Sequence, residues 1–238
     1  MDKLVFLDTE TTGNDFFNDW LFQICYSFKD KISCEYFKPK TPISVKAQSI
    51  THVTNKMIED KKPFEGSLMQ KDLHDLLKEN ILVAHNAVFD IAMLTKEKIE
   101  ISKFICTLKI ARFLDEEMQV PEFNLQFLRY YFELDAKADA HDAKSDVIVL
   151  KALFEYQLKK VIELYKSEDK AIEELIRISK EPFLYKVFPF GKYKGRKVEE
   201  ISLLDKNYLE WLLVQKTQNN KENEEDWIFT LKYHLKVH

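Results

Sequence analysis

The hydrophobic positions near the start of the chain form short apolar runs separated by turns. Residues 4–7 are four consecutive apolar residues and predict a buried β-strand. Two runs rich in aromatic and β-branched residues, 20–28 and 31–37, flank a Lys29-Asp30 turn and predict a β-hairpin. We therefore expect these three segments to lie in one sheet.

Further along the chain, short apolar runs alternate with helical periodicity. Residues 81–84 and 105–106 are candidate short strands, and a helical pattern follows each of them. Helices are expected over residues 44–50, 55–60, 67–79 and 107–114, and from Ala140 or His141 to about 162. Two more are expected, one that follows Asn86 as its N-cap and runs through Leu94, and one that follows Pro121 and runs through Phe132. This alternation predicts an α/β fold with a mixed sheet.

The last quarter of the chain differs in character from the rest. A charged helical connector is expected over residues 166–182, which separates a first domain at 1–165 from a small, mainly helical extension at 183–238. The extension begins with a basic and aromatic segment, 186–197, that has five Lys or Arg residues and no acid. Helices are expected after it, over 198–204, 208–214 and about 224–236.

Composition bears on the cellular location of the protein and on how it could bind nucleic acid. The chain has no run of 18 apolar residues and no basic segment followed by an apolar one at its start, so neither a membrane span nor a signal peptide is expected. Cys25, Cys34 and Cys106 are an odd set without metal-ligand spacing, which favours reduced thiols and a cytoplasmic location. The net charge of −4 means that nucleic acid would be held by local patches and metal ions.

Two carboxylates follow the first strand directly. Asp8 and Glu10 are two residues apart, so on a strand they point to the same face. Like charges held side by side repel one another, and a divalent cation is what such a pair needs. Asp90, in the first turn of a helix, and Asp146, inside a later helix, are further candidates. Each also has an ordinary structural interpretation, as an acid favouring a helix dipole or as an exposed helix residue.

The acids form one ordered pattern when they are taken together. They comprise a D-x-E at a strand end (Asp8, Glu10), an H-N-x-x-F-D ending at Asp90, and an H-x-x-x-x-D from His141 to Asp146. Over residues 1 to about 163 the chain thus resembles the DnaQ-like (DEDDh) 3′→5′ exonucleases. The resemblance implies an RNase H-like, mixed five-stranded sheet flanked by helices. It also implies a metal-dependent 3′→5′ exodeoxyribonuclease that releases nucleoside 5′-monophosphates in DNA repair or end trimming.

The chemistry explains why these residue types are needed. Phosphodiester hydrolysis by two divalent cations about 3.5–4 Å apart activates a water and neutralises the transition state. Carboxylate oxygens suit Mg²⁺, which Mn²⁺ can replace. By the resemblance, Asp8 bridges both ions, Glu10 and Asp146 complete one site, and Asp90 serves the other. His141 is expected to be the general base, because a pKa of about 6.5 suits accepting a proton near neutrality.

Other residues around the acids are expected to contact nucleic acid. Many family members have a leucine after the Thr-Thr-Gly turn, and here that position is Asn14. Phe16 and Phe17 can stack on a base instead, or can fill the core. His52 is open between substrate contact and local packing. The candidate nucleic-acid contacts are Thr9, Thr11, Thr12, Asn14, Phe16, Phe17, His52, Asn86, Phe89, Lys192, Lys194 and Arg196.

The C-terminal segment resembles the corresponding region of the bacterial exonuclease X-like proteins. The residues that carry the likeness are F-G-K-Y-K-G-R at 190–196 and the apolar positions around Trp211. Its bases can grip DNA, or they can be the solvated side chains of a hairpin that packs on Trp211, which is expected in the core with its leucine neighbours.

Two other functions remain open at the level of sequence. An RNA-trimming 3′→5′ exoribonuclease would differ by its contact to the 2′-hydroxyl, and no residue settles this. A proofreading module would act mainly by binding a polymerase. DNA 3′ ends are therefore the expected partner, a polymerase or repair protein is a further one, no membrane is expected, and the oligomeric state is open.

Overall fold

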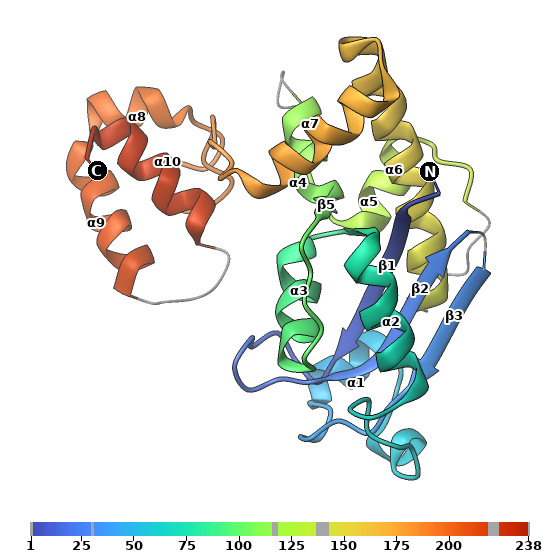
Figure 1. Ribbon diagram of the computed structural model, residues 1–238. Coiled ribbons are helices and arrows are strands. Elements are labelled where there is room, and N and C mark those ends of the chain that lie inside the picture. Colours follow the sequence, from blue (N-terminus) through green and yellow to red (C-terminus); the bar gives the residue numbers. More distant parts are fainter. Residues whose placement is uncertain (1, 30, 116–118, 137–142, 219–223, 238) are drawn as a thin grey trace. The chain divides into compact units, whose positions relative to one another are not determined.

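The computed structural model describes residues 2–29, 31–115, 119–136, 143–218 and 224–237. The chain divides into two compact units, Met1–Lys180 and Glu181–His238, which are drawn in Figure 1. The first unit has two large hydrophobic clusters, and the second unit has a hydrophobic core of its own. In the described ranges, no helix combines the length and the apolar character needed to cross a membrane.

The first unit is built on a mixed five-stranded sheet. Its strands are β1 (Leu4–Thr11), β2 (Leu21–Phe28), β3 (Lys31–Tyr36), β4 (Ile81–Ala84) and β5 (Phe104–Cys106), in the order β3-β2-β1-β4-β5. β1, β2 and β3 pair antiparallel, whereas β4 and β5 run parallel to β1. The expected hairpin and the expected five-stranded sheet are both confirmed.

Helices cover the two faces of this sheet. They are α1 (Val45–Thr51), the 3₁₀ turn η1 (Asn55–Ile58), α2 (Leu68–Glu79), α3 (Ala87–Lys96), α4 (Thr107–Leu114), α5 (Leu125–Tyr131), α6 (Ala143–Tyr165) and α7 (Glu168–Lys180). Phe6 packs with α6 and α7 in one core, and Leu7 packs with α2 and α3 in the other. Because strand side chains alternate, Asp8 and Glu10 continue the face of Phe6 and point toward α6.

Helix α7 is part of the first unit. It packs against β5, α4 and α6. Ser179 ties it to the sheet, since its hydroxyl accepts a hydrogen bond from the Cys106 backbone N–H at 2.7 Å and donates one to the Leu175 carbonyl at 2.6 Å. The segment expected to be a connector therefore contributes a helix to the fold that holds the site.

The cysteines differ from the expectation of three reduced thiols. Cys25 and Cys34 stand directly opposite one another on β2 and β3, with Cα atoms 4.1 Å apart, and form a disulfide. Cys106 is free and buried, as expected. The pairing arises because the β2–β3 register, in which Phe28 stands opposite Lys31, also places Cys25 opposite Cys34.

The second unit is a small helical module. It contains a β-bridge between Val187 and Lys197, followed by α8 (Val198–Leu204), α9 (Lys206–Gln218) and α10 (Glu225–Leu235). Its core centres on Phe188 and Trp227, whose rings stack with centroids 5.4 Å apart. Trp211 is 54% exposed, so the expectation that it lies in the core is wrong; its neighbours Leu209 and Leu212 are buried.

Candidate active site

Three carboxylates converge at the end of β1. Asp8 and Glu10 come from the strand, and Asp146 comes from the first turn of α6. One oxygen from each lies within 4.8 Å of the other two. The pairing of β1 with β2 shifts between Glu10 and Thr11, and such irregularities re-aim side chains beside active sites. The fold thus brings together acids that are more than 130 residues apart in sequence.

Asp90 is held next to this trio by β1 itself. It is 4% exposed in the first turn of α3. Its Oδ1 accepts a hydrogen bond from the Thr9 hydroxyl at 2.7 Å. Among the described residues, the 4.8 Å group does not include Asp90, yet its charge acts on Asp8. Asp90 is therefore a neighbour of the cluster, oriented by Thr9.

The electrostatics of the cluster favour a bound cation. Burial raises the pKa of Asp8 well above its usual value, and the charges of Asp90, Glu10 and Asp146 raise it further. Burial also raises the pKa of Asp90 to about 7, although the hydrogen bond from Thr9 opposes this. A divalent cation relieves the repulsion, and a set of carboxylate oxygens alone suits a hard ion such as Mg²⁺ or Mn²⁺. The residues present therefore fit a divalent metal.

Gln126 is a site residue that the sequence pattern did not reveal. It lies on α5, where the Asn124 side chain accepts a hydrogen bond from the Phe127 N–H at 2.8 Å and so begins the helix. The Gln126 amide Nε2 donates to Asp146 Oδ1 at 2.5 Å. Gln126 thereby fixes the orientation of a carboxylate in the cluster.

His85, which directly follows β4, has a structural role. Its Nε2 lies 2.7 Å from the Phe123 carbonyl oxygen, and its Nδ1 lies 2.9 Å from the Thr107 hydroxyl. Burial lowers the pKa of His85 to about 4, so the ring is neutral at pH 7. It therefore donates from Nε2 to Phe123 and ties the segment before α5 to the sheet.

His141, the expected general base, lies outside the described residues. His52 is exposed and ends α1 with a left-handed backbone, φ 57°. Asn86 is the N-cap residue of α3, as expected, with φ 63°, but its side chain makes no capping hydrogen bond. Asparagine suits this position because it tolerates the left-handed conformation.

The loop after β1 is held in a defined shape by its own side chains. The Thr11 hydroxyl donates to the Gly13 carbonyl, and the Thr12 hydroxyl donates to Asp19, each at 2.7 Å. Gly13 leaves room for the Asp19 carboxylate, which a Cβ would meet. These contacts hold together the turn that directly follows the strand carrying Asp8 and Glu10.

The two phenylalanines of this loop have different environments. Phe16 packs edge-on against Phe89, with ring centroids 5.3 Å apart, and is half-buried. Phe17 is 67% exposed, and Asn14 is also exposed. Of the two roles considered for these rings, Phe16 has the packing role, because it contacts Phe89 beside Asp90. The Phe17 ring is exposed and can still stack on a base.

Lys96 at the end of α3 fastens the same loop and was not found from the sequence. Its ammonium donates to the backbone carbonyls of Phe16 and Phe17 at 3.1 Å each, and to that of Asp19. It also lies 4.1 Å from the centre of the Trp20 ring. One side chain therefore holds most of the loop to the helix that carries Asp90.

Removing this anchor is expected to weaken substrate binding more than chemistry. In Lys96→Met the loop loses its charged donor, so we expect KM to rise by roughly tenfold with kcat nearly unchanged. Steady-state kinetics on a single-stranded oligonucleotide measure this. Lys96→Arg should restore part of the loss, and Lys98→Met, which removes only an exposed pair with Glu65, is the matched control. Equal KM values for Lys96→Met and Lys98→Met would contradict the role.

The basic residues of the C-terminal module are partly neutralised within it. Hydrogen bonds to Tyr193 and Asp205 raise the pKa of Lys192 to about 12, and its Nζ lies 3.0 Å from Asp205 Oδ2. Arg196 pairs with Glu200. Lys194 is exposed on the turn between Gly191 and Gly195, both of which have positive φ. Of the three candidates, Lys194 projects most freely from the turn.

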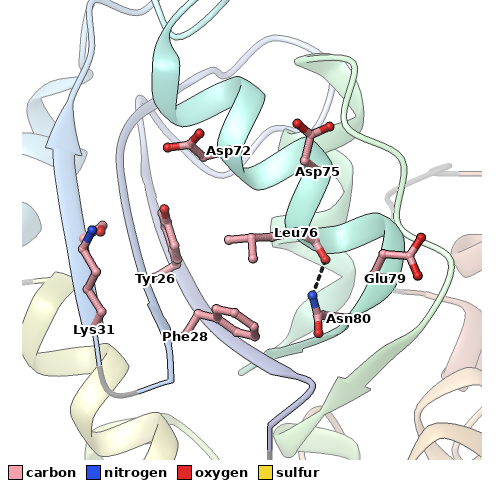
Figure 2. Close-up of a pocket in the computed structure, with 9 residues that line it drawn as sticks. Tyr26, Phe28, Lys31, Asp72, Asp75, Leu76, Glu79 and Asn80 are labelled. Carbon is pink, nitrogen blue, oxygen red and sulfur yellow. Dashed lines mark hydrogen bonds between the residues drawn. The ribbon is translucent and has the colours of Figure 1, made fainter.

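A separate groove of about 510 Å³ lies on the other face of the sheet. Figure 2 shows Leu76 pointing from α2 toward the side of Tyr26 and Phe28, below Asp72 and Asp75. Tyr26 pairs with Leu7 in the β1–β2 register, whereas Cys25 pairs with Asp8. The groove is therefore on the face opposite to the carboxylate cluster and is not part of it.

Comparison with known proteins agrees with this geometry. The family model described as "Exonuclease" matches residues 5–154, and the chain belongs to this exonuclease family. A second model, described as "Exodeoxyribonuclease X-like C-terminal", matches residues 188–216. The protein is a nuclease of the DnaQ-like type, and its C-terminal module is of the exonuclease X kind, so both resemblances found in the sequence are confirmed.

Individual relatives share a moderate part of their sequence with this chain. Exodeoxyribonuclease 10 of Escherichia coli K12 is 28% identical over 200 residues, which are 83% of this chain and 82% of that protein. PolC-type DNA polymerase III of Streptococcus pyogenes is 37% identical over 124 residues, 48% of this chain but 8% of the polymerase. A structure of exonuclease X with 5′-overhanging duplex DNA matches at a TM-score of 0.57, with 24% identity, over 74% of this chain and 99% of that one. The RNase H-like fold is thereby confirmed.

Proposed function

We propose that the protein is a metal-dependent 3′→5′ exodeoxyribonuclease that releases nucleoside 5′-monophosphates from DNA during repair or end trimming. The observation that carries the proposal is the cluster of Asp8, Glu10 and Asp146 within 4.8 Å, in a chain of the exonuclease family. The relative of similar length is named an exodeoxyribonuclease, and exonuclease X was solved with DNA, which supports DNA as substrate.

The residues divide the work as the resemblance implies. Asp8, Glu10 and Asp146 would hold divalent ions, with Asp90 serving the second; Mg²⁺ is the proposed metal and Mn²⁺ a substitute. When bound, two such ions supply an activated water and neutralise charge on the phosphate. Gln126 keeps the Asp146 carboxylate oriented. His141 accepts the proton of the attacking water in this proposal, and Thr9 fixes Asp90.

The proofreading alternative has one observation in its favour. A segment of the chain is similar to part of a PolC-type DNA polymerase III, of which it covers 8%. A proofreading role predicts stable co-purification with a polymerase. The C-terminal module favours a free-standing nuclease instead, because its family model is named for exonuclease X and it has its own core. We therefore place the exodeoxyribonuclease first.

The test of the function uses the full chain without partners. Matched DNA and RNA strands, single- and double-stranded, are incubated with Mg²⁺, and the products are identified by chromatography. We expect deoxynucleoside 5′-monophosphates from DNA at a rate at least about tenfold above the release from RNA. Faster release of ribonucleotides would replace this proposal with RNA trimming. Absence of monophosphates from all four substrates would reject exonuclease activity.

A further inference from the structure

Helix α5 presents aromatic rings to solvent instead of burying them. Tyr130 is 70% exposed and Tyr131 is 41% exposed, while Leu128 is the buried residue of the helix. The rings of Phe127 and Tyr131 stack with centroids 5.8 Å apart and an interplanar angle of 23°. Together with Asn124 and Gln126, the three rings line a groove of about 490 Å³. We call Phe127, Tyr130 and Tyr131 the α5 shelf.

One residue, Gln126, links this groove to the carboxylate cluster. Gln126 lines it and also donates a hydrogen bond to Asp146 at 2.5 Å. Tyr130 follows Gln126 by four residues, so the two side chains lie on the same side of α5, one turn apart. An exposed tyrosine ring thus stands one helical turn from the residue that touches a candidate metal ligand.

The charge next to the shelf favours a polyanion. The Arg129 guanidinium lies 5.3 Å from the centre of the Tyr130 ring and donates to the Ala136 carbonyl at 2.5 Å. In the described part of the chain, no acidic residue lines this groove. Exposed rings beside a cation are the combination that holds single strands, since rings stack on bases and cations attract phosphates.

We propose that the α5 shelf stacks on an unpaired base of the substrate strand, with Tyr130 as the contacting ring. The inference rests on the proposed function, because it names how the strand is held while its 3′ end reaches Asp8 and Asp146. Burial of the rings against a second protein would need a partner that also approaches the carboxylates. The position beside Gln126 favours the strand that must enter there.

The test measures binding and turnover separately. Tyr130→Ala and Tyr130→Trp are compared with Tyr165→Ala, a control that removes a 38% exposed tyrosine at the far end of α6. The probe is a single-stranded DNA with non-hydrolysable linkages at its 3′ end, followed by fluorescence anisotropy. A second series of probes has one abasic residue, moved stepwise away from the 3′ end.

Tyr130→Ala is expected to weaken binding about tenfold, as loss of one stacking contact does, while Tyr130→Trp and Tyr165→Ala bind like the wild type. An abasic residue at one position should weaken binding to the wild type and leave Tyr130→Ala unaffected. On cleavable DNA, KM should rise and kcat should stay constant.

Two results would overturn the inference. The first is that the wild type binds DNA and Tyr130→Ala binds it with the same affinity. The second is that an abasic residue weakens binding equally in both proteins at every position. Failure of the wild type to bind or cut any strand would instead reject the proposed function, so the two failures are distinguishable.

Discussion

Asp8→Asn is expected to abolish turnover while making the metal-free protein more stable. Asp8 is the acid on which the charges of Asp90, Glu10 and Asp146 all act. An amide removes one of the negative charges of the cluster, so the carboxylates that would hold the proposed divalent ions would bind them much more weakly. We expect kcat to fall by about three orders of magnitude or more, measured on single-stranded DNA with Mg²⁺.

The gain in stability follows from the raised pKa of Asp8. The folded state binds the Asp8 proton more tightly than the unfolded state does. The contribution of this proton to the free energy of unfolding is therefore fully present below pH about 4 and is lost as pH rises through the folded pKa. Asn has no charge to bury and lacks this decline. In EDTA at pH 7.5, Tm should rise by roughly 2–5 °C relative to the wild type.

The control is the same substitution at an aspartate outside the cluster. Asp72→Asn changes an exposed carboxylate on α2, beside the groove on the opposite face. It should leave both kcat and Tm unchanged. If Asp8→Asn instead kept activity, or lowered Tm in EDTA between pH 6 and 8, the carboxylate cluster would not be the metal site.

His141→Ala is expected to have the second-largest effect. A general base contributes about 10²–10⁴-fold to a rate, so kcat should fall within that range. Metal affinity should be retained if, as proposed, the residue takes the proton of the attacking water and does not bind the ion. Mn²⁺ titration by calorimetry and single-turnover kinetics measure the two quantities. His74→Ala, at a partly exposed position of α2, is the control. Loss of Mn²⁺ binding in His141→Ala would make it a ligand.

Elements with strong local patterns could be predicted from the sequence. The apolar run at 4–7 predicted a strand buried on both faces, and the two-residue spacing of Asp8 and Glu10 predicted that their side chains share a face. The Lys29-Asp30 turn specified the β2–β3 hairpin. The same turn implies that Cys25 faces Cys34, because Phe28 opposite Lys31 sets the register. The hairpin register could therefore have predicted the disulfide, whereas the odd number of cysteines favoured reduced thiols.

Residues that act through tertiary contacts could not be predicted. Gln126 reaches Asp146 across 20 residues, and Lys96 reaches the loop of Phe16 across 80. Neither contact has a sequence period, since the first depends on how α5 packs beside α6 and the second on how the loop after β1 lies against α3. Trp211 shows the same limit. Trp211 and Trp227 both lie in helices of the module, but only Trp227 is buried in its core, and this difference depends on tertiary packing.

The direction of digestion tests the central claim most directly. A DNA strand labelled at its 5′ end is incubated with the protein and Mg²⁺, and a parallel reaction contains EDTA. The account predicts a ladder of labelled fragments that shorten stepwise from the 3′ end with Mg²⁺, and an intact strand with EDTA. Release of the 5′ label as a mononucleotide at the earliest times, or an unchanged ladder in EDTA, would contradict it.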